Sequence, residues 1–262
     1  MSIDARRVLM TASLLGLCFP ASASATWSII VVDRTSGVVG AAAASCTSDV
    51  HGILGLVPGT GVVLAQAIGH PPALGEALRL LREDVSPDSV LRFITHSSVD
   101  SATHERQYAI ATISGGQAQF TGSATMGYRG ERSALGVLVQ GSLLVGPEVL
   151  DRTMFAIMEA RAAGKPMEEV LMEALKAGAD AGGDSRCGEQ RATTAFLTVA
   201  RPGDIANWPY LTLRVVGVEQ GTTVNAVDLL HARFVHWQAA EGPKYSITSE
   251  TVRPGSATRE ER

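Results

Sequence analysis

A threonine stands between a segment typical of a secretory signal peptide and a strand-like run. Thr26 directly follows Ala23-Ser24-Ala25 and directly precedes the apolar run 27–32. If export removes residues 1–25, this one residue carries both a nucleophilic hydroxyl and a free α-amine. With a reference pKa of about 8, the amine can accept the hydroxyl proton near neutral pH, whereas before cleavage the same nitrogen is an amide. The position of Thr26 therefore predicts nucleophilic attack on an acyl carbon, switched on by export.

Residues 1–25 have the three parts of a signal peptide. Two arginines form a basic start, the stretch 8–19 is mostly apolar but too short to span a bilayer, and small residues follow. The small-x-small rule allows the mature chain to begin at Ser24, Ala25 or Thr26, and the sequence does not choose among them. We expect an exported protein, periplasmic or secreted. The plainer interpretation of Thr26 is the first residue of a strand, where β-branched side chains are favoured.

Composition narrows the classes of partner. The chain has 262 residues and a net charge of −4, with 26 acidic against 22 basic side chains. No basic stripe is present to hold nucleic acid, and no second long apolar run follows the first, so we expect neither a nucleic-acid partner nor stable membrane insertion. The six histidines show no metal-ligand spacing, and the glycine-rich run 57–61 lacks the lysine of a phosphate-binding loop. We therefore expect no metal and no cofactor.

Two cysteines remain once Cys18 leaves with the signal peptide. In an oxidising compartment Cys46 and Cys187 most simply form one disulfide. A loop of that length would stabilise the fold by about 4–5 kcal/mol in the chain-entropy model. The competing hypothesis makes Cys46 a nucleophile with His51 as its base.

Apolar periodicity and turn residues predict alternating groups of strands and helices. One predicted helix keeps Leu74, Ala77, Leu78 and Leu81 on one face, and the next begins at Pro87 with Ser86 as its N-cap. Further helices begin at Pro147 and Pro166, and a last one carries apolar residues between 227 and 237. The predicted strands are 26–33, 38–45, 61–68, 107–113, 117–121, 136–140, 193–200 and 210–216.

This order lacks strict strand–helix alternation, which disfavours a doubly wound parallel sheet. The expected fold class is α+β, with two mainly antiparallel sheets packed face to face and helix pairs on both outer sides. One domain would span 26–241, and the polar stretch 242–262 is expected to be a disordered tail. In the glycine-rich loop 182–186, we expect Asp184 and Arg186 to form an ion pair that orders the loop.

Several short segments occur together in a distinctive order. They are Thr-Trp-Ser-Ile-Ile-Val-Val-Asp (26–33), Gly-Ala-Ala-Ala-Ala-Ser-Cys (40–46), Gln-Ala (66–67), Thr-Gly-Ser-Ala (121–124), Val-Gln-Gly-Ser (139–142) and Gly-Gly-Asp-Ser-Arg-Cys (182–187). In combination they resemble an uncharacterised bacterial and archaeal domain-of-unknown-function family assigned to the Ntn (N-terminal nucleophile) hydrolase superfamily. The resemblance covers about residues 26–200.

The resemblance implies an αββα four-layer sandwich with Thr26 at the position of the nucleophile. It also implies that this chain is similar to an exported branch in which the two cysteines occur together, which supports the disulfide. Many members have a lysine in place of Cys46 and an asparagine in place of Ser142. Two side chains that could assist the nucleophile in those members are therefore changed here. Resemblance and strand-end location together give the candidate polar neighbours of the nucleophile: Ser45, Gln66, Ser123, Gln140 and Asp184.

The leading functional hypothesis is an exported amidohydrolase or peptidase-like enzyme that acts on a C–N bond. Its partner would be a small-molecule or peptide amide, with cell-wall peptides as one class, and homo-oligomerisation is left open. The alternative is a non-catalytic exported scaffold or binding protein that retains the sandwich. The changes at Cys46 and Ser142 favour this alternative, and a fold does not guarantee an activity.

Overall fold

Two antiparallel sheets form the centre of the computed structural model, which describes residues 26–240. The strands are β1 (Thr26–Val32), β2 (Val39–Ser45), β3 (Leu54–Val57), β4 (Gly61–Ala67), β5 (Arg106–Thr112), β6 (Gln117–Thr121), β7 (Tyr128–Ala134), β8 (Val137–Leu144), β9 (Thr194–Ala200) and β10 (Leu211–Val215). The larger sheet has the order β10-β9-β2-β1-β8-β7 and the smaller sheet the order β3-β4-β5-β6. The predicted signal peptide at 1–25 and tail at 242–262 lie outside the described residues.

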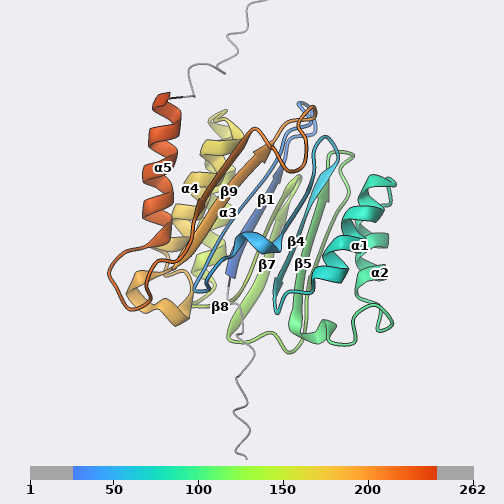
Figure 1. Cartoon of the computed structure of the whole chain (residues 1–262), viewed down its shortest axis with the longest axis horizontal. Coiled ribbons are helices and arrows are strands. Elements are labelled where there is room, and N and C mark those ends of the chain that lie inside the picture. The colour runs from blue at the N-terminus through green and yellow to red at the C-terminus, as the bar shows by residue number, and fades with distance from the viewer. Residues whose placement is uncertain (1–25, 241–262) are drawn as a thin grey trace, which may run out of the picture.

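Helices cover the outer face of each sheet. They are α1 (Pro71–Arg82), α2 (Pro87–Ile94), α3 (Glu148–Ala162), α4 (Met167–Asp180) and α5 (Ala226–Ala240). The first two pack on the smaller sheet and the other three on the larger one, which gives the helix–sheet–sheet–helix layers in Figure 1. The predicted α+β class with two antiparallel sheets is thereby confirmed. None of the helices within 26–240 is long and apolar enough to cross a membrane.

Burial on both faces explains why β1 is apolar apart from Thr26 and Ser28. Trp27 and Ile29 pack under the α3–α4 layer, whereas Ile30 and Val32 pack against the smaller sheet. Side chains of a strand alternate between faces, so a central strand of this sandwich needs an apolar residue at nearly every position. The alanine run of β2 serves both faces in the same way, and its small side chains let α4 approach closely.

The sequence prediction missed two strands and shortened a third. β3 has four residues, one of them a glycine, and offers too little alternation to detect. β7 is polar and only partly buried because it is the edge strand of the larger sheet. β8 continues to Leu144, beyond the predicted end at 140. At the start of α2, Ser86 makes no side-chain cap and its hydroxyl donates to Ser89 instead.

Close packing of α4 on β1 depends on a glycine. A Cβ atom at Gly178 would lie 2.6 Å from Thr153 Oγ1 and 2.6 Å from Trp27 Nε1, and both of those residues are fully buried. Because the Trp27 ring cannot move away without disturbing the core, we expect Gly178→Ala to lower the free energy of unfolding by about 1–3 kcal/mol. Urea denaturation would measure the change.

Gly75 provides the matched control, since it also lies within a helix but has open space around it. Alanine has the higher helix propensity, so Gly75→Ala should raise the free energy of unfolding by up to about 1 kcal/mol. Equal effects at the two positions would contradict the packing argument.

Candidate functional site

The layer between the two sheets changes from apolar to polar toward the first residue of β1. Ile30 and Val32 lie in the apolar part, whereas Thr26 and Ser28 occupy the same face of β1 at the other end. Thr26 lies opposite Ser45 of β2 and Ser142 of β8. All of these polar side chains are buried. A buried polar cluster at a sheet end is a candidate site because burying polar groups is unfavourable unless they are bonded or used.

Hydrogen bonds run in one direction through this cluster and join the two sheets. Ser28 of β1 donates to Gln66 Oε1 of β4, and Gln66 Nε2 donates to Gln107 Oε1 of β5 over 3.1 Å. Gln107 Nε2 then donates to Thr121 Oγ1, and Thr121 donates to the Glu131 carboxylate of β7. The series therefore ends on an ionisable acceptor. The same two side-chain amides also donate hydrogen bonds to the backbone of the larger sheet. Gln66 donates to the Thr26 carbonyl and Gln107 to the Gly141 carbonyl.

Two members of the cluster have no hydrogen-bond partner among residues 26–240. They are the Thr26 hydroxyl and the Gln140 amide, of which neither the nitrogen nor the oxygen is bonded. Gln140 lies opposite Ser28 and diagonal to Thr26, a spacing that a long side chain can bridge. An unpaired buried polar group costs about 1–3 kcal/mol. Unpaired groups at two neighbouring positions of β1 and β8 make this end of the sandwich the candidate site.

Asp184 orders a loop beside this cluster. Its carboxylate accepts hydrogen bonds from the Cys46 N–H at 2.7 Å and from Arg186 Nη2 at 2.7 Å. The predicted ion pair with Arg186 is thus confirmed. Arg186 also reaches toward the Ser45 hydroxyl, 3.5 Å away. Both oxygens of the fully buried carboxylate are engaged, so Asp184 is placed to hold the end of β2 rather than to take a proton.

The predicted disulfide joins the same two segments. Cys46 and Cys187 are bonded, with 6.0 Å between their Cα atoms. The hypothesis of a Cys46 nucleophile with a His51 base is therefore wrong, because the sulfur is used in the covalent link. His51 instead packs edge-on against Phe196.

A small cavity of about 60 Å³ opens beside Ser142. Ala67 and Leu143 line it at the ends of β4 and β8, and both have positive φ angles, 67° and 53°. Residues other than glycine rarely adopt this conformation, and each instance costs about 1–3 kcal/mol. The rest of its lining is Ile68, Glu105, Ala124, Thr125 and Met126.

A buried ion pair supports one wall of this cavity. Arg106 donates through Nε to Asp100 at 2.8 Å and through Nη1 to the Ile68 carbonyl at 2.6 Å. Burial alone would raise the pKa of Asp100, but the hydrogen bonds and charge of Arg106 hold it below its ordinary value. The pair therefore fixes the chain after Gln66 through the Ile68 carbonyl. Arg106 itself directly precedes Gln107 in β5.

Four of the predicted neighbours lie around Thr26, and one does not enter the cluster. Ser45, Gln66 and Gln140 are members of it, and Asp184 borders it. Ser123 is exposed on the loop after β6, where its carbonyl accepts a hydrogen bond from Arg129. The prediction omitted Ser28 and Gln107. Ser28 could have been found from strand alternation alone, since it shares the face of Thr26.

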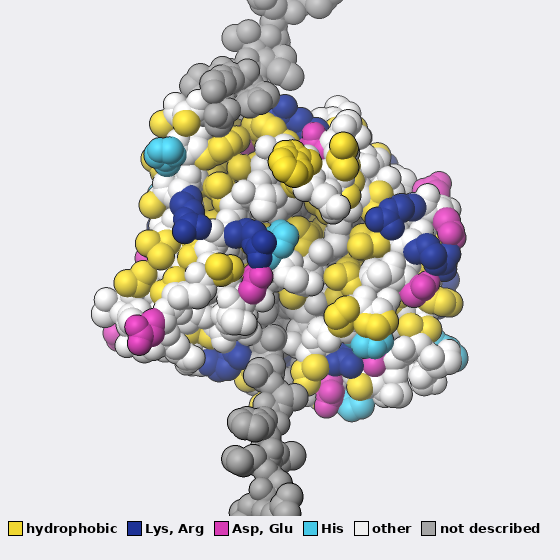
Figure 2. All heavy atoms as spheres, in the orientation of Figure 1, with side chains coloured by type: hydrophobic (Ala, Val, Ile, Leu, Met, Phe, Trp, Pro, Cys, Tyr) yellow, Lys and Arg dark blue, Asp and Glu magenta, His cyan; other side chains and the backbone are white. Residues whose placement is uncertain are grey.

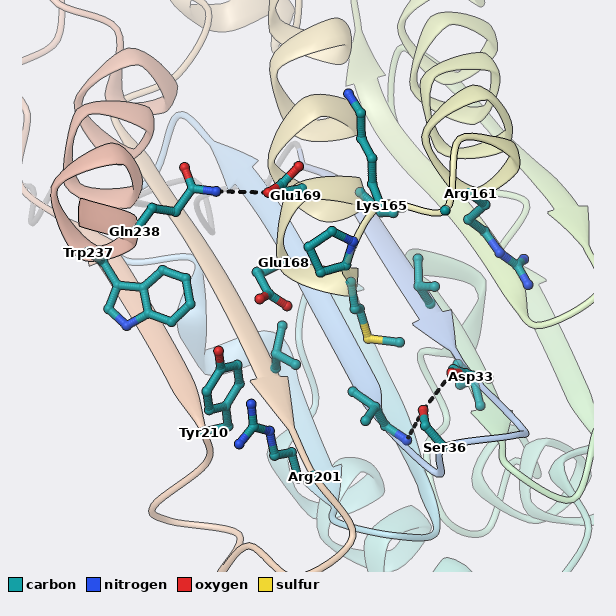
Figure 3. A pocket seen from close by; sticks show the side chains of 18 residues that line it. Asp33, Ser36, Arg161, Lys165, Glu168, Glu169, Arg201, Tyr210, Trp237 and Gln238 are labelled. Carbon is teal, nitrogen blue, oxygen red and sulfur yellow. Dashed lines mark hydrogen bonds between the residues drawn. The ribbon is translucent and has the colours of Figure 1, made fainter. Parts of the chain in front are cut away.

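A larger cavity, of about 1010 Å³, lies at the other end of β1, about 20 Å from Thr26. Figure 3 shows that its polar groups pair with one another: Asp33 accepts from Ser36, and Gln238 donates to Glu169. Arg201 lies over the Tyr210 ring, 3.5 Å from its centroid. Burial raises the pKa of Glu168, which lines this cavity. Thr26, the nucleophile predicted from the sequence, does not line it.

The buried ion pair should leave a pH signature. Removing one charge of such a pair is expected to cost about 3 kcal/mol, so Asp100→Asn should lower the free energy of unfolding by that amount at pH 7. The folded-state pKa of Asp100 is lowered, so its contribution is complete above the unfolded value of about 4 and is lost as the pH falls through the lower folded value. Urea denaturation at pH 7 and pH 3 should show a smaller difference at pH 3. Glu83→Gln, which breaks an exposed pair with Arg79, should change stability by less than about 1 kcal/mol.

Comparison with known proteins identifies the family and the fold. A crystal structure of protein SPO2555 from Silicibacter pomeroyi, which carries the family designation DUF1028, superposes with a TM-score of 0.69 at 24% identity. The match covers 85% of this chain and 93% of that one. Proteins with curated descriptions gave no match. The model of the family of unknown function DUF1028 matches residues 26–223, so the chain belongs to that family.

Proposed function

We propose that this protein is an exported amidohydrolase of the N-terminal nucleophile type, with Thr26 as nucleophile. The observation that carries the proposal is the fully buried Thr26 hydroxyl, which has no partner among residues 26–240 although hydrogen-bonded polar groups surround it. The order of layers is the αββα order of that superfamily. The disulfide is compatible with an oxidising compartment.

In the proposed reaction the Thr26 α-amine accepts the hydroxyl proton, directly or through a bridging water, and Oγ1 attacks the amide carbonyl. The C–N bond then breaks, the leaving amine takes the proton from the α-ammonium group, and an ester on Thr26 remains. Water hydrolyses the ester and releases a carboxylic acid, which regenerates the hydroxyl. The hydrogen bond from Gln66 to the Thr26 carbonyl holds the first residue in place for both steps.

Gln140 has a separate role in this proposal, because its amide is free to bond. Its nitrogen would donate to the oxyanion that forms on the substrate carbonyl. A well-placed donor of this kind contributes about 3–4 kcal/mol to the transition state. Ser142, where the family resemblance implies asparagine, lies opposite Thr26 and on the same strand as Gln140, but it presents a shorter side chain.

A non-catalytic exported binding protein is the second candidate. The observation in its favour is that Asp184 and Arg186 are bonded to each other and to the end of β2, which is a structural use of the charged groups nearest Thr26. Cys46, at the position where many relatives carry lysine, is bound in the disulfide.

The nucleophile can be tested on processed protein with a β-lactone probe, followed by mapping of the acylated residue. We expect ester formation at Thr26 in the wild type, none in Thr26→Ala, and a slower reaction in Thr26→Ser, which keeps the hydroxyl and the amine. Intact-mass analysis would establish that the chain begins at Thr26. A form that retains Ala25 should be inert because its nitrogen at Thr26 is an amide. Labelling of Thr26→Ala to the wild-type extent would refute the enzyme and favour the binding protein.

Replacing Gln140 separates catalysis from stability. Neither atom of its amide has a hydrogen-bond partner in the described part of the chain, so Gln140→Leu should leave the free energy of unfolding unchanged or slightly raised. The rate of acylation of Thr26 should nevertheless fall about 10²–10³-fold. Gln66→Leu is the control, since it breaks bonds to Ser28, Gln107 and Thr26 and should destabilise the fold. A loss of stability in Gln140→Leu as large as that of the control would show a structural role instead.

A further inference from the structure

The two sheets differ in width, and the difference leaves an open groove along one side of the sandwich. The smaller sheet packs over β1, β2, β7 and β8 and ends at β3, whereas the larger sheet continues through β9 to β10. The inner face of β9 is buried at Phe196, Thr198 and Ala200, whereas Thr212 and Arg214 of β10 are exposed, so β10 forms a shelf next to β3. A groove of about 620 Å³ lies there, at the hollowed face between the two sheets in Figure 2.

The groove has an apolar floor and a hydrogen-bonding edge. Leu54 and Leu56 of β3, together with Leu78 of α1, supply apolar surface, and Thr198 and Thr212 also line the groove. β3 is the outermost strand of its sheet, so on its outer side no strand of residues 26–240 pairs with it. An edge strand presents N–H and C=O groups that another extended chain can bond.

An exposed aromatic side chain on an ordered loop lines the groove. Trp208 is 83% exposed, although the loop that carries it is well ordered by hydrogen bonds. The Trp208 N–H donates to the Ile205 carbonyl, and the Asp204 carboxylate accepts from the N–H groups of Arg201 and Tyr210 at the two ends of the loop. An exposed tryptophan on a constrained turn is typical of the residues that dominate binding energy.

The charge of the lining selects among extended chains. Arg82, Arg214 and His51 line the groove, and no carboxylate does. Arg214 already pairs with Asp49 at 2.5 Å, so Arg82 is left at the rim to contact an acidic group. Burial and the charge of Arg214 lower the pKa of His51, which is therefore mostly neutral at pH 7.

The width of the shelf argues against a second folded copy. Strands lie about 4.8 Å apart, so the exposed inner face of the single strand β10 leaves room for one added strand. A second copy that paired through its own β3 would bring its larger sheet or its α1–α2 layer onto the same shelf. A single extended segment meets no such obstruction.

We infer that the groove binds an extended acidic peptide segment, which adds as a fifth strand to the smaller sheet beside β3 and packs under Trp208. Main-chain hydrogen bonds to β3 would supply affinity. Alternate side chains would contact the Leu54–Leu56 floor, and a carboxylate would contact Arg82. This site is independent of Thr26 and does not rest on the proposed hydrolase.

A pair of synthetic peptides tests the inference. The probe is a capped decapeptide of alternating glutamate and valine, measured by calorimetry and by amide hydrogen exchange of residues 54–57. We expect binding together with slowed exchange at β3, about tenfold weaker binding in Trp208→Ala, and about threefold weaker binding in Arg82→Glu. Arg92→Glu, an equal charge reversal on α2, should bind like the wild type.

Three outcomes would overturn the inference. The first is undetectable binding of the acidic peptide by the folded wild type. The second is equal binding of the same peptide N-methylated at alternate residues, which removes its main-chain donors, or of a lysine–valine peptide. The third is a dimer in sedimentation that Trp208→Ala dissolves, which would assign the groove to a second copy.

Discussion

The arrangement of the Thr26 end depends on polar groups buried between two sheets. A sandwich interior is normally filled by apolar side chains, and here the apolar filling on the inner face of β1 ends at Ile30, so that Ser28 and Thr26 are polar. Beyond that point the sheets are joined by side-chain hydrogen bonds that leave the larger sheet at Ser28, pass along the smaller sheet and return to the larger sheet at Glu131. Such a network stabilises the fold only when every member is satisfied, because the low dielectric makes each unpaired group costly. The Thr26 hydroxyl and the Gln140 amide, which have no hydrogen-bond partner among residues 26–240, are therefore the places where the network is incomplete.

The surroundings of this network limit how its members can move. The Asp184 carboxylate and the disulfide fix the end of β2, and the Arg106–Asp100 pair fixes the chain after β4. Two residues in the left-handed conformation turn the chain away at the ends of β4 and β8. Strain of this kind persists only where the surrounding contacts impose it, and it is concentrated in many proteins at functional sites. The same end of the sandwich thus combines rigid support with unpaired polar groups.

Most of the fold could be predicted from the sequence because the apolar periodicity agrees with the positions of turn residues and prolines in its central elements. The run 26–33 and the prolines before the helices gave nearly correct boundaries. The strands that escaped prediction were β3 and β7, where shortness or an exposed edge removes the alternating pattern. The candidate residues on central strands could be placed because alternation determines which face each side chain occupies. The hydrogen bonds of Gln107 and the exposed inner face of β10 could not be predicted, since they arise from how the two sheets are superposed.

The direction of the hydrogen bonds between Ser28 and Glu131 has a consequence for which sequences this interior can accept. Each amide must present its nitrogen to the next residue and its oxygen to the previous one. Glutamate has nearly the same shape as glutamine, yet at position 66 it would set a carboxylate oxygen against both the Gln107 oxygen and the Thr26 carbonyl. Spontaneous deamidation of that side chain would have the same effect. Chemical ageing at a single buried amide would therefore weaken the contact between the two sheets at the Thr26 end of β1.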